Sequence, residues 1–103
     1  MGRCNYYAGS AFGLYAPQWD HSYPAGAWNR ARIVVQDGNV EHWLNGEKLL
    51  AFDMKSEEFA NRKANSKFKD WSKFAVADEG HIALQDHGDR VAYRNIKLRS
   101  LPA

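Results

Sequence analysis

Three short stretches rich in hydrophobic side chains lie in the middle of the chain, and the second of them alternates hydrophobic and polar positions. These stretches cover residues 32–36, 40–44 and 48–52 and contain β-branched or aromatic residues, which favour strands. Asp37-Gly38-Asn39 separates the first two and Asn45-Gly46 the last two. Both separators suit tight turns, because Asn and Gly tolerate a positive φ. The pattern predicts an antiparallel β-meander of three strands.

A helical pattern follows the third stretch. Ser56 precedes Glu57 and Glu58; serine caps a first helical turn, and acidic side chains there interact favourably with the helix dipole. The sequence therefore predicts a short helical insertion near 56–71, starting at Ser56 and reaching as far as Trp71. Three aromatic residues are expected to hold this insertion against the sheet: Phe68, Trp71 and Phe74.

Three further stretches have the composition of strands, at 11–16, 80–86 and 90–99. In the last of them, a bulge near Arg94-Asn95 would bring the apolar side chains to a common face, because one extra residue shifts the alternation. Residues 17–29 contain two prolines and a glycine among aromatic side chains, which predicts an aromatic-rich loop. The fold class is therefore mainly β, as an antiparallel sandwich or jelly-roll sheet with one helical insertion.

Composition places the chain among ordinary folded proteins. Its 103 residues are enough for one small domain spanning 1–103, with no clear pattern in 1–10. The aromatic content of 14% supplies large apolar side chains and argues against disorder. The net charge of +2, with both signs interspersed, indicates no nucleic-acid partner. Cys4 is the sole cysteine and cannot form an intrachain disulfide.

No apolar run reaches the roughly 20 residues needed to cross a membrane, so no membrane partner is expected. The first residues also lack the apolar core of a signal peptide. The sequence as given favours the cytoplasm. A secreted or periplasmic location applies if the chain is a fragment of a longer precursor, and the localisation is left open.

Six predicted strands in one sheet would leave an apolar face uncovered. Two packed sheets usually need more strands than this sequence offers. We therefore expect either that another chain covers the face or that part of the domain lies outside this sequence.

Six sequence blocks occur in an order that resembles one protein family. They are Tyr15-Ala16-Pro17, Pro24-Ala25-Gly26-Ala27-Trp28-Asn29, Val40-Glu41-His42-Trp43-Leu44-Asn45-Gly46, Ser66-Lys67-Phe68-Lys69-Asp70-Trp71, Gly80-His81-Ile82-Ala83-Leu84-Gln85-Asp86-His87-Gly88 and Tyr93-Arg94-Asn95-Ile96-Lys97-Leu98-Arg99. The series resembles the C-terminal half of the 3-keto-disaccharide hydrolase domain family, long described as a domain of unknown function. The third and fifth blocks are specific in combination.

The resemblance implies a concanavalin-like jelly roll of two antiparallel sheets that acts on sugars oxidised at carbon 3. Family members are longer, and this sequence begins near their midpoint, which implies a half-domain. A homodimer of two half-sandwiches, or a strand-exchanged oligomer, would cover the apolar face. The expected partners are a second copy of the chain and a small carbohydrate ligand.

A ketone at carbon 3 makes the proton at carbon 2 of a sugar acidic. Removing that proton forms an enolate, the carbon 1 substituent leaves, and water adds back. The chemistry needs a general base, a group that stabilises the enolate and a platform for the ring. An ordinary glycosidase instead needs two carboxylates that flank the bond, and the sequence offers no clear pair.

Two residues are the candidate catalytic groups. His87 is the first, because histidine titrates near neutral pH. Glu41 is the second: alternation places it on the outer, concave face of its strand, opposite the apolar side chains. Trp43 shares that face and would stack on a sugar ring, whereas His42 would point to the interior.

Four further residues are candidates for substrate binding. Gln85 and His81 share one face of the strand predicted at 80–86, and an amide both donates and accepts hydrogen bonds. Arg94 would stabilise an enolate or pair with a nearby aspartate. Tyr15 would line a sugar pocket, with a core or loop-anchoring role as the alternative.

The spacing of His81, Asp86 and His87 matches no strong metal-ligand motif, so we predict no metal and no cofactor. Asp86 is expected to brace a turn or to pair with Arg94, because a buried carboxylate needs a partner. Three alternatives remain open. The chain is an enzyme that cleaves 3-keto glycosides, or it is a non-catalytic carbohydrate-binding or interaction module, or a shortened family member without activity.

Overall fold

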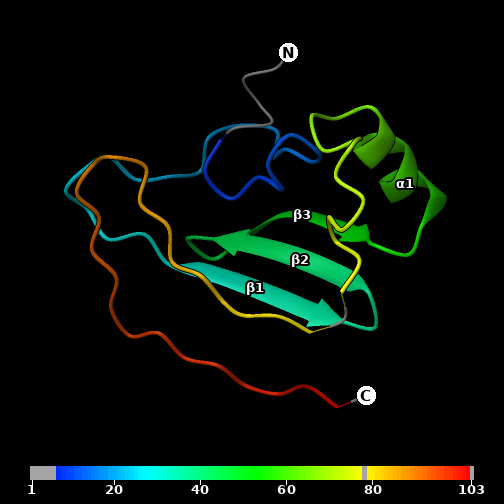
Figure 1. Ribbon diagram of the computed structural model, residues 1–103. Helices are drawn as coiled ribbons and strands as arrows, with labels where there is room; N and C mark the ends of the chain where they lie inside the picture. Colours follow the sequence, from blue (N-terminus) through cyan, green and yellow to red (C-terminus); the bar gives the residue numbers. More distant parts are fainter. Residues whose placement is uncertain (1–6, 78, 103) are drawn as a thin grey trace.

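The computed structural model describes residues 7–77 and 79–102, and its centre is a three-stranded antiparallel sheet with the order β1-β2-β3. The strands are β1 (Ala31–Gln36), β2 (Asn39–Leu44) and β3 (Glu47–Asp53), and one helix, α1 (Glu57–Ala64), follows them (Figure 1). The predicted meander and helical insertion are confirmed. The fold is mainly antiparallel β with one short helix.

The two hairpin turns have the backbone that their sequences predict. Asp37 and Gly38 have φ values of 52° and 84°, and Asn45 and Gly46 have 52° and 86°. Two consecutive positive φ values define the turn whose twist matches that of the flanking strands. Asn, Asp and Gly adopt this backbone most readily, so the register of both hairpins is set locally.

One irregularity interrupts the ladder between β2 and β3. His42 pairs with Leu50 and Trp43 pairs with Lys48, which leaves Leu49 as an extra residue in β3. This arrangement is a β-bulge, and a bulge redirects the side chains beside it.

The core forms where the N-terminal segment and α1 pack on β3. Leu14, Tyr15, Phe59 and Phe68 are buried there, with Leu50, Phe52 and Phe74 packed against them. The rings of Tyr15 and Phe52 stack with centroids 4.5 Å apart, and those of Phe68 and Phe74 stack at 4.2 Å. Phe68 and Phe74 thus hold the insertion to the core as predicted, while Trp71 stays largely exposed.

The helix begins as expected and ends earlier than expected. The Ser56 hydroxyl accepts a hydrogen bond from the Phe59 amide at 3.1 Å, which is the N-cap interaction. The helix ends at Ala64, not at Trp71. Residues 66–74 form successive turns with bonds between residues three apart, such as Trp71 N to Phe68 O. These turns bring Phe68 and Phe74 into contact with the core, and a continuing helix would not.

Three predicted strands are absent. Residues 11–15 form a tight turn closed by an isolated bridge between Ala11 and Tyr15, and the predictions at 80–86 and 90–99 are wrong, because these stretches form no ladder. Alternation marks a strand only where a partner supplies hydrogen bonds, and these stretches have no such partner in the described part of the chain. The predicted bulge is therefore also absent, although Asn95 has a positive φ of 56°.

One side of the sheet is only partly covered. Ile33 and Val35 lie opposite His42 and Val40, so they share the face that carries the core. Val40 is buried, but Ile33 is 67% exposed. The C-terminal segment, orange to red in Figure 1, runs outside the sheet. The uncovered apolar face expected from the sequence is therefore present at β1.

Candidate functional site

The centre of the candidate site is a pair of side chains on β2. Trp43 Nε1 donates a hydrogen bond to Glu41 Oε1 at 2.9 Å, and both residues are partly buried. They lie on the face opposite Val40 and Leu44, which are both buried. The predicted arrangement of a carboxylate beside an indole is therefore formed.

The neighbouring strands give this face mixed chemistry. Arg32 pairs with Trp43 across the sheet, and its guanidinium carbon lies 5.8 Å from the centre of the indole ring. This cation–π contact orients the indole. Val34 and Ala51 flank Glu41 in the register. The carboxylate forms no ion pair within the described residues, and its Oε2 atom accepts no hydrogen bond from any of them.

The remaining predicted polar residues lie on the exposed C-terminal segment. His81 and His87 make no hydrogen bond or ion pair with any described residue. The carbonyl of Gln85 accepts a hydrogen bond from the Tyr93 hydroxyl at 2.6 Å. Asp86 accepts from the Gly88 amide at 3.3 Å and so braces a turn, the first of its two expected roles.

Two of the predicted site residues have aromatic or core partners. The guanidinium of Arg94 lies 3.9 Å from the centre of the Trp28 ring. Tyr15 is buried in the core, where burial, reinforced by the Glu58 carboxylate, raises the pKa of its hydroxyl. Tyr15 is thus a core residue, which was the expected alternative to lining a sugar pocket. Within the described residues, neither Arg94 nor Tyr15 forms a hydrogen bond or ion pair with Glu41.

His42 faces the interior, as expected from alternation. Its Nδ1 atom lies 2.6 Å from the carbonyl oxygen of Gly9, and its ring meets that of Phe52 edge-on, with centroids 5.9 Å apart. The histidine is therefore a satisfied structural residue.

Asn45, expected only to form the hairpin turn, also anchors the aromatic loop. Its Nδ2 atom donates to the carbonyl of His21 at 3.0 Å and to Asn29 Oδ1 at 2.9 Å. Its Oδ1 atom accepts from the Arg30 amide at 3.0 Å. A side chain that reaches residues 24 positions away cannot be recognised from local spacing. Asn45 thus fixes the shape of residues 17–29.

A hollow lies between this loop and the start of β3. It is lined by Gln18, Trp19, His21, Glu47, Lys48 and Leu49. His21 Nδ1 and Glu47 Oε2 are 2.6 Å apart. The aromatic loop and the start of β3 come together only in the tertiary structure, so no sequence motif indicates this hollow.

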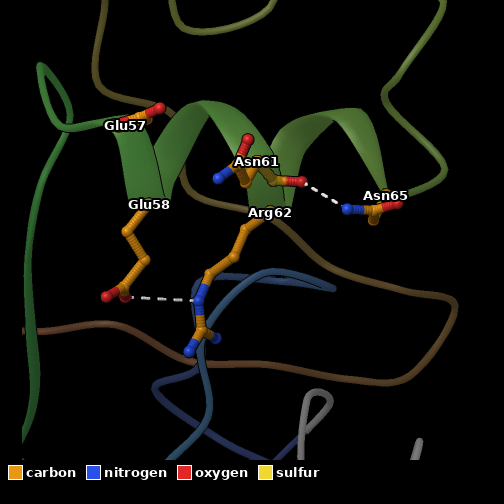
Figure 2. Close-up of a pocket in the computed structure, with 5 residues that line it drawn as sticks. All are labelled: Glu57, Glu58, Asn61, Arg62 and Asn65. Carbon is orange, nitrogen blue, oxygen red and sulfur yellow. Dashed lines mark hydrogen bonds and ion pairs between the residues drawn. The ribbon is translucent and has the colours of Figure 1, made fainter.

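A second hollow lies along α1 and is lined by Glu57, Glu58, Asn61, Arg62 and Asn65 (Figure 2). Its polar groups bind one another: Glu58 and Arg62 form an ion pair at 3.4 Å, and Asn65 Nδ2 donates to the Asn61 carbonyl at 2.9 Å. These contacts are typical of a solvated helix face.

Among residues 7–77 and 79–102, no three His, Cys, Asp or Glu side chains are grouped to hold a metal ion. No helix in the same ranges is long and apolar enough to cross a membrane.

Comparison with known proteins assigns the chain to a family. Residues 2–99 match the 3-keto-alpha-glucoside-1,2-lyase-like domain, and the chain belongs to this family. It is 35% identical over 89 residues to a 3-keto-disaccharide hydrolase of Bacteroides thetaiotaomicron, with 76% of this chain and 30% of that protein covered. The resemblance found in the sequence blocks is confirmed.

A solved structure supports the same assignment. The crystal structure of a candidate glycosyl hydrolase from Parabacteroides distasonis matches 67% of this chain with a TM-score of 0.63 and 35% identity. The match covers 32% of that structure's chain. The present chain thus spans about a third of the length of both relatives, and its fold agrees with part of a β-sandwich.

Proposed function

We propose that the protein cleaves glycosides whose sugar ring carries a ketone at carbon 3, with Glu41 as the base that removes the carbon 2 proton. Membership of a family described as 3-keto-alpha-glucoside-1,2-lyase-like supports the substrate class. The observation that carries the proposal is the hydrogen bond between Glu41 and Trp43. It places a fixed carboxylate beside an aromatic surface on which a sugar ring can stack.

The proposed reaction has two balanced steps. In the first, Glu41 takes the carbon 2 proton, the carbon 1–oxygen bond breaks and a carbon 1–carbon 2 double bond forms. The leaving alkoxide takes up a proton and departs as an alcohol, so charges and atoms balance. In the second step, water adds across the double bond and yields the free 3-keto sugar. The negative charge that develops is delocalised onto the ketone oxygen as an enolate, so no second carboxylate is required.

The surroundings of Glu41 suit a base. The indole N–H binds Oε1 and fixes the orientation of the carboxylate, while Oε2 accepts no hydrogen bond from another described residue. The register neighbours Val34 and Ala51 supply no competing charge. A positioned carboxylate of this kind contributes about 10²–10⁴-fold to proton transfer. His87 is the proposed proton donor to the leaving group.

The proposal is tested by incubating the protein with methyl 3-keto-α-D-glucopyranoside and measuring methanol release. Glu41→Gln keeps the size and an acceptor for Trp43 but removes the base, so we expect a fall in rate of at least ~100-fold. His87→Ala should give a smaller loss that is rescued by added imidazole. Glu57→Gln is the matched control on α1 and should retain the parental rate. Equal rates for the parent and Glu41→Gln would refute Glu41 as the base, and no methanol release by the parent would refute the activity.

A further inference from the structure

We propose that the hollow between the aromatic loop and the start of β3 is a second carbohydrate site, which binds a neutral pyranose ring. The site adjoins the Glu41–Trp43 face, because Lys48 pairs with Trp43 in the sheet register, but neither Glu41 nor Trp43 lines it, and it does not depend on the proposed catalysis. Its walls come from two segments: Gln18, Trp19 and His21 from the loop, and Glu47, Lys48 and Leu49 from β3.

Trp19 supplies the stacking surface of this site. The residue is 57% exposed although it borders the hollow. The His21 ring supports it, with centroids 4.9 Å apart and planes tilted by 31°. The C–H groups on one face of a pyranose are apolar and weakly positive, and they complement the negative face of an indole. An exposed but supported indole is therefore suited to a sugar ring.

The close contact between His21 and Glu47 supplies the polar part of the site. His21 Nδ1 lies 2.6 Å from Glu47 Oε2, with the histidine side chain 10% exposed and the glutamate side chain 64% exposed. The covered imidazole thus orients a carboxylate that remains open to a ligand. Gln18 adds an amide and Lys48 an ammonium group. Acceptors and donors around an aromatic surface fit the hydroxyl groups of a neutral sugar.

The backbone around the hollow is held before any ligand arrives. The Asp20 carboxylate accepts hydrogen bonds from the amide and the hydroxyl of Ser22, at 2.9 and 2.6 Å, which fixes the turn between Trp19 and Ser22. Asn45 binds the carbonyl of His21 from the adjacent hairpin. A loop ordered in this way loses less conformational entropy on binding.

The bulge in β3 completes the arrangement. The extra residue, Leu49, follows Lys48 directly, and both line the hollow. In a regular strand consecutive side chains point to opposite faces, and a bulge redirects them. The irregularity thus brings an apolar and a cationic side chain to the same hollow.

The test uses methyl α-D-glucopyranoside, which has no ketone and so cannot undergo the proposed elimination. Indole N–H signals in ¹H–¹⁵N NMR spectra report binding at each tryptophan separately. We expect saturable shifts at the Trp19 signal. Both Trp19 variants lack that signal, so their binding is followed at the backbone amides of His21 and Lys48, which also line the hollow. Trp19→Ala should weaken binding at least tenfold, equal to about 1.4 kcal/mol, and Trp19→Phe should restore most of the affinity. Glu47→Ala should also weaken binding, because it removes the acceptor and frees His21.

Trp71→Ala is the matched control, because Trp71 is also 57% exposed but lies outside the hollow. It should bind as the parent does, and so should Glu41→Gln. No saturable shift at Trp19, or equal affinities for Trp19→Ala and Trp71→Ala, would overturn the proposal. Binding that persists in Glu41→Gln while its turnover of the 3-keto glycoside is lost would separate this site from the catalytic one.

Discussion

Arg62 links α1 to the N-terminal segment through one contact with Leu14 and one with Tyr15. Its Nη1 atom donates to the Leu14 carbonyl at 2.7 Å, and its guanidinium carbon lies 4.2 Å from the centre of the Tyr15 ring. The same side chain also faces Glu58 on its own helix. This one residue therefore couples a helix to a tight turn that lies about 48 positions earlier in the chain.

Replacing Arg62 should destabilise the protein more than removing its ion-pair partner. Arg62→Ala loses a charge-assisted hydrogen bond and a cation–π contact, which together are expected to contribute about 1–3 kcal/mol. Glu58→Gln removes a surface ion pair of about 0.5 kcal/mol or less and the negative charge beside Tyr15, but leaves both Arg62 contacts in place. Urea denaturation followed by circular dichroism measures both free energies of unfolding. Equal losses in the two variants would contradict the role assigned to the contacts with Leu14 and Tyr15.

Asn45 should prove important for the aromatic loop as well as for the hairpin turn. Asn45→Gly keeps a residue that accepts the φ of 52° but removes the side-chain bonds to His21, Asn29 and Arg30. We expect a loss of about 1–3 kcal/mol and faster amide hydrogen exchange in residues 21–30. A variant with unchanged exchange in this loop would show that the turn conformation alone matters.

The hydroxyl of Tyr15 should make stability depend on alkaline pH. Burial, with a contribution from Glu58, raises its pKa in the folded protein above the ordinary value of 10.0. The neutral form is thus favoured in the folded state. The resulting stability is fully present below pH 10.0 and is lost as the pH rises through the folded-state pKa.

Tyr15→Phe isolates this effect. The substitution keeps the stacked ring and removes the titrating hydroxyl, so the fall in stability above pH 10.0 should become shallower. Urea denaturation between neutral and alkaline pH provides the measurement. Parallel curves for the parent and Tyr15→Phe would exclude Tyr15 as the source of the dependence.

Self-association, expected from the sequence, stays a prediction, and the structure locates the surface that it concerns. Ile33 and Val35 are exposed on the face that elsewhere carries the core. A second copy of the chain that covers this face would remove apolar area from water, worth about 25 cal/mol per Å². Ile33→Lys should lower the molar mass measured by light scattering at micromolar concentration. Val76→Lys places the same charge on another exposed apolar residue and should have no effect, and a monomeric parent would contradict the prediction.

Local sequence determined the parts of the fold whose interactions are local. The turns at Asp37-Gly38 and Asn45-Gly46 require a positive φ that few residues accept, so the β-meander was readable directly. The N-cap at Ser56 depends only on the next three residues. The pairing of Glu41 with Trp43 followed from strand alternation, since residues two apart share a face.

Tertiary structure decided what depends on partners distant in sequence. Residues 80–86 alternate like a strand, yet a strand exists only where another supplies ladder hydrogen bonds, and the described chain provides none there. The hollow around His21 and Glu47 arises because Asn45 folds the aromatic loop onto the hairpin. Residue spacing along the chain does not predict such contacts, because they form between segments that meet only after the sheet and its loop have folded.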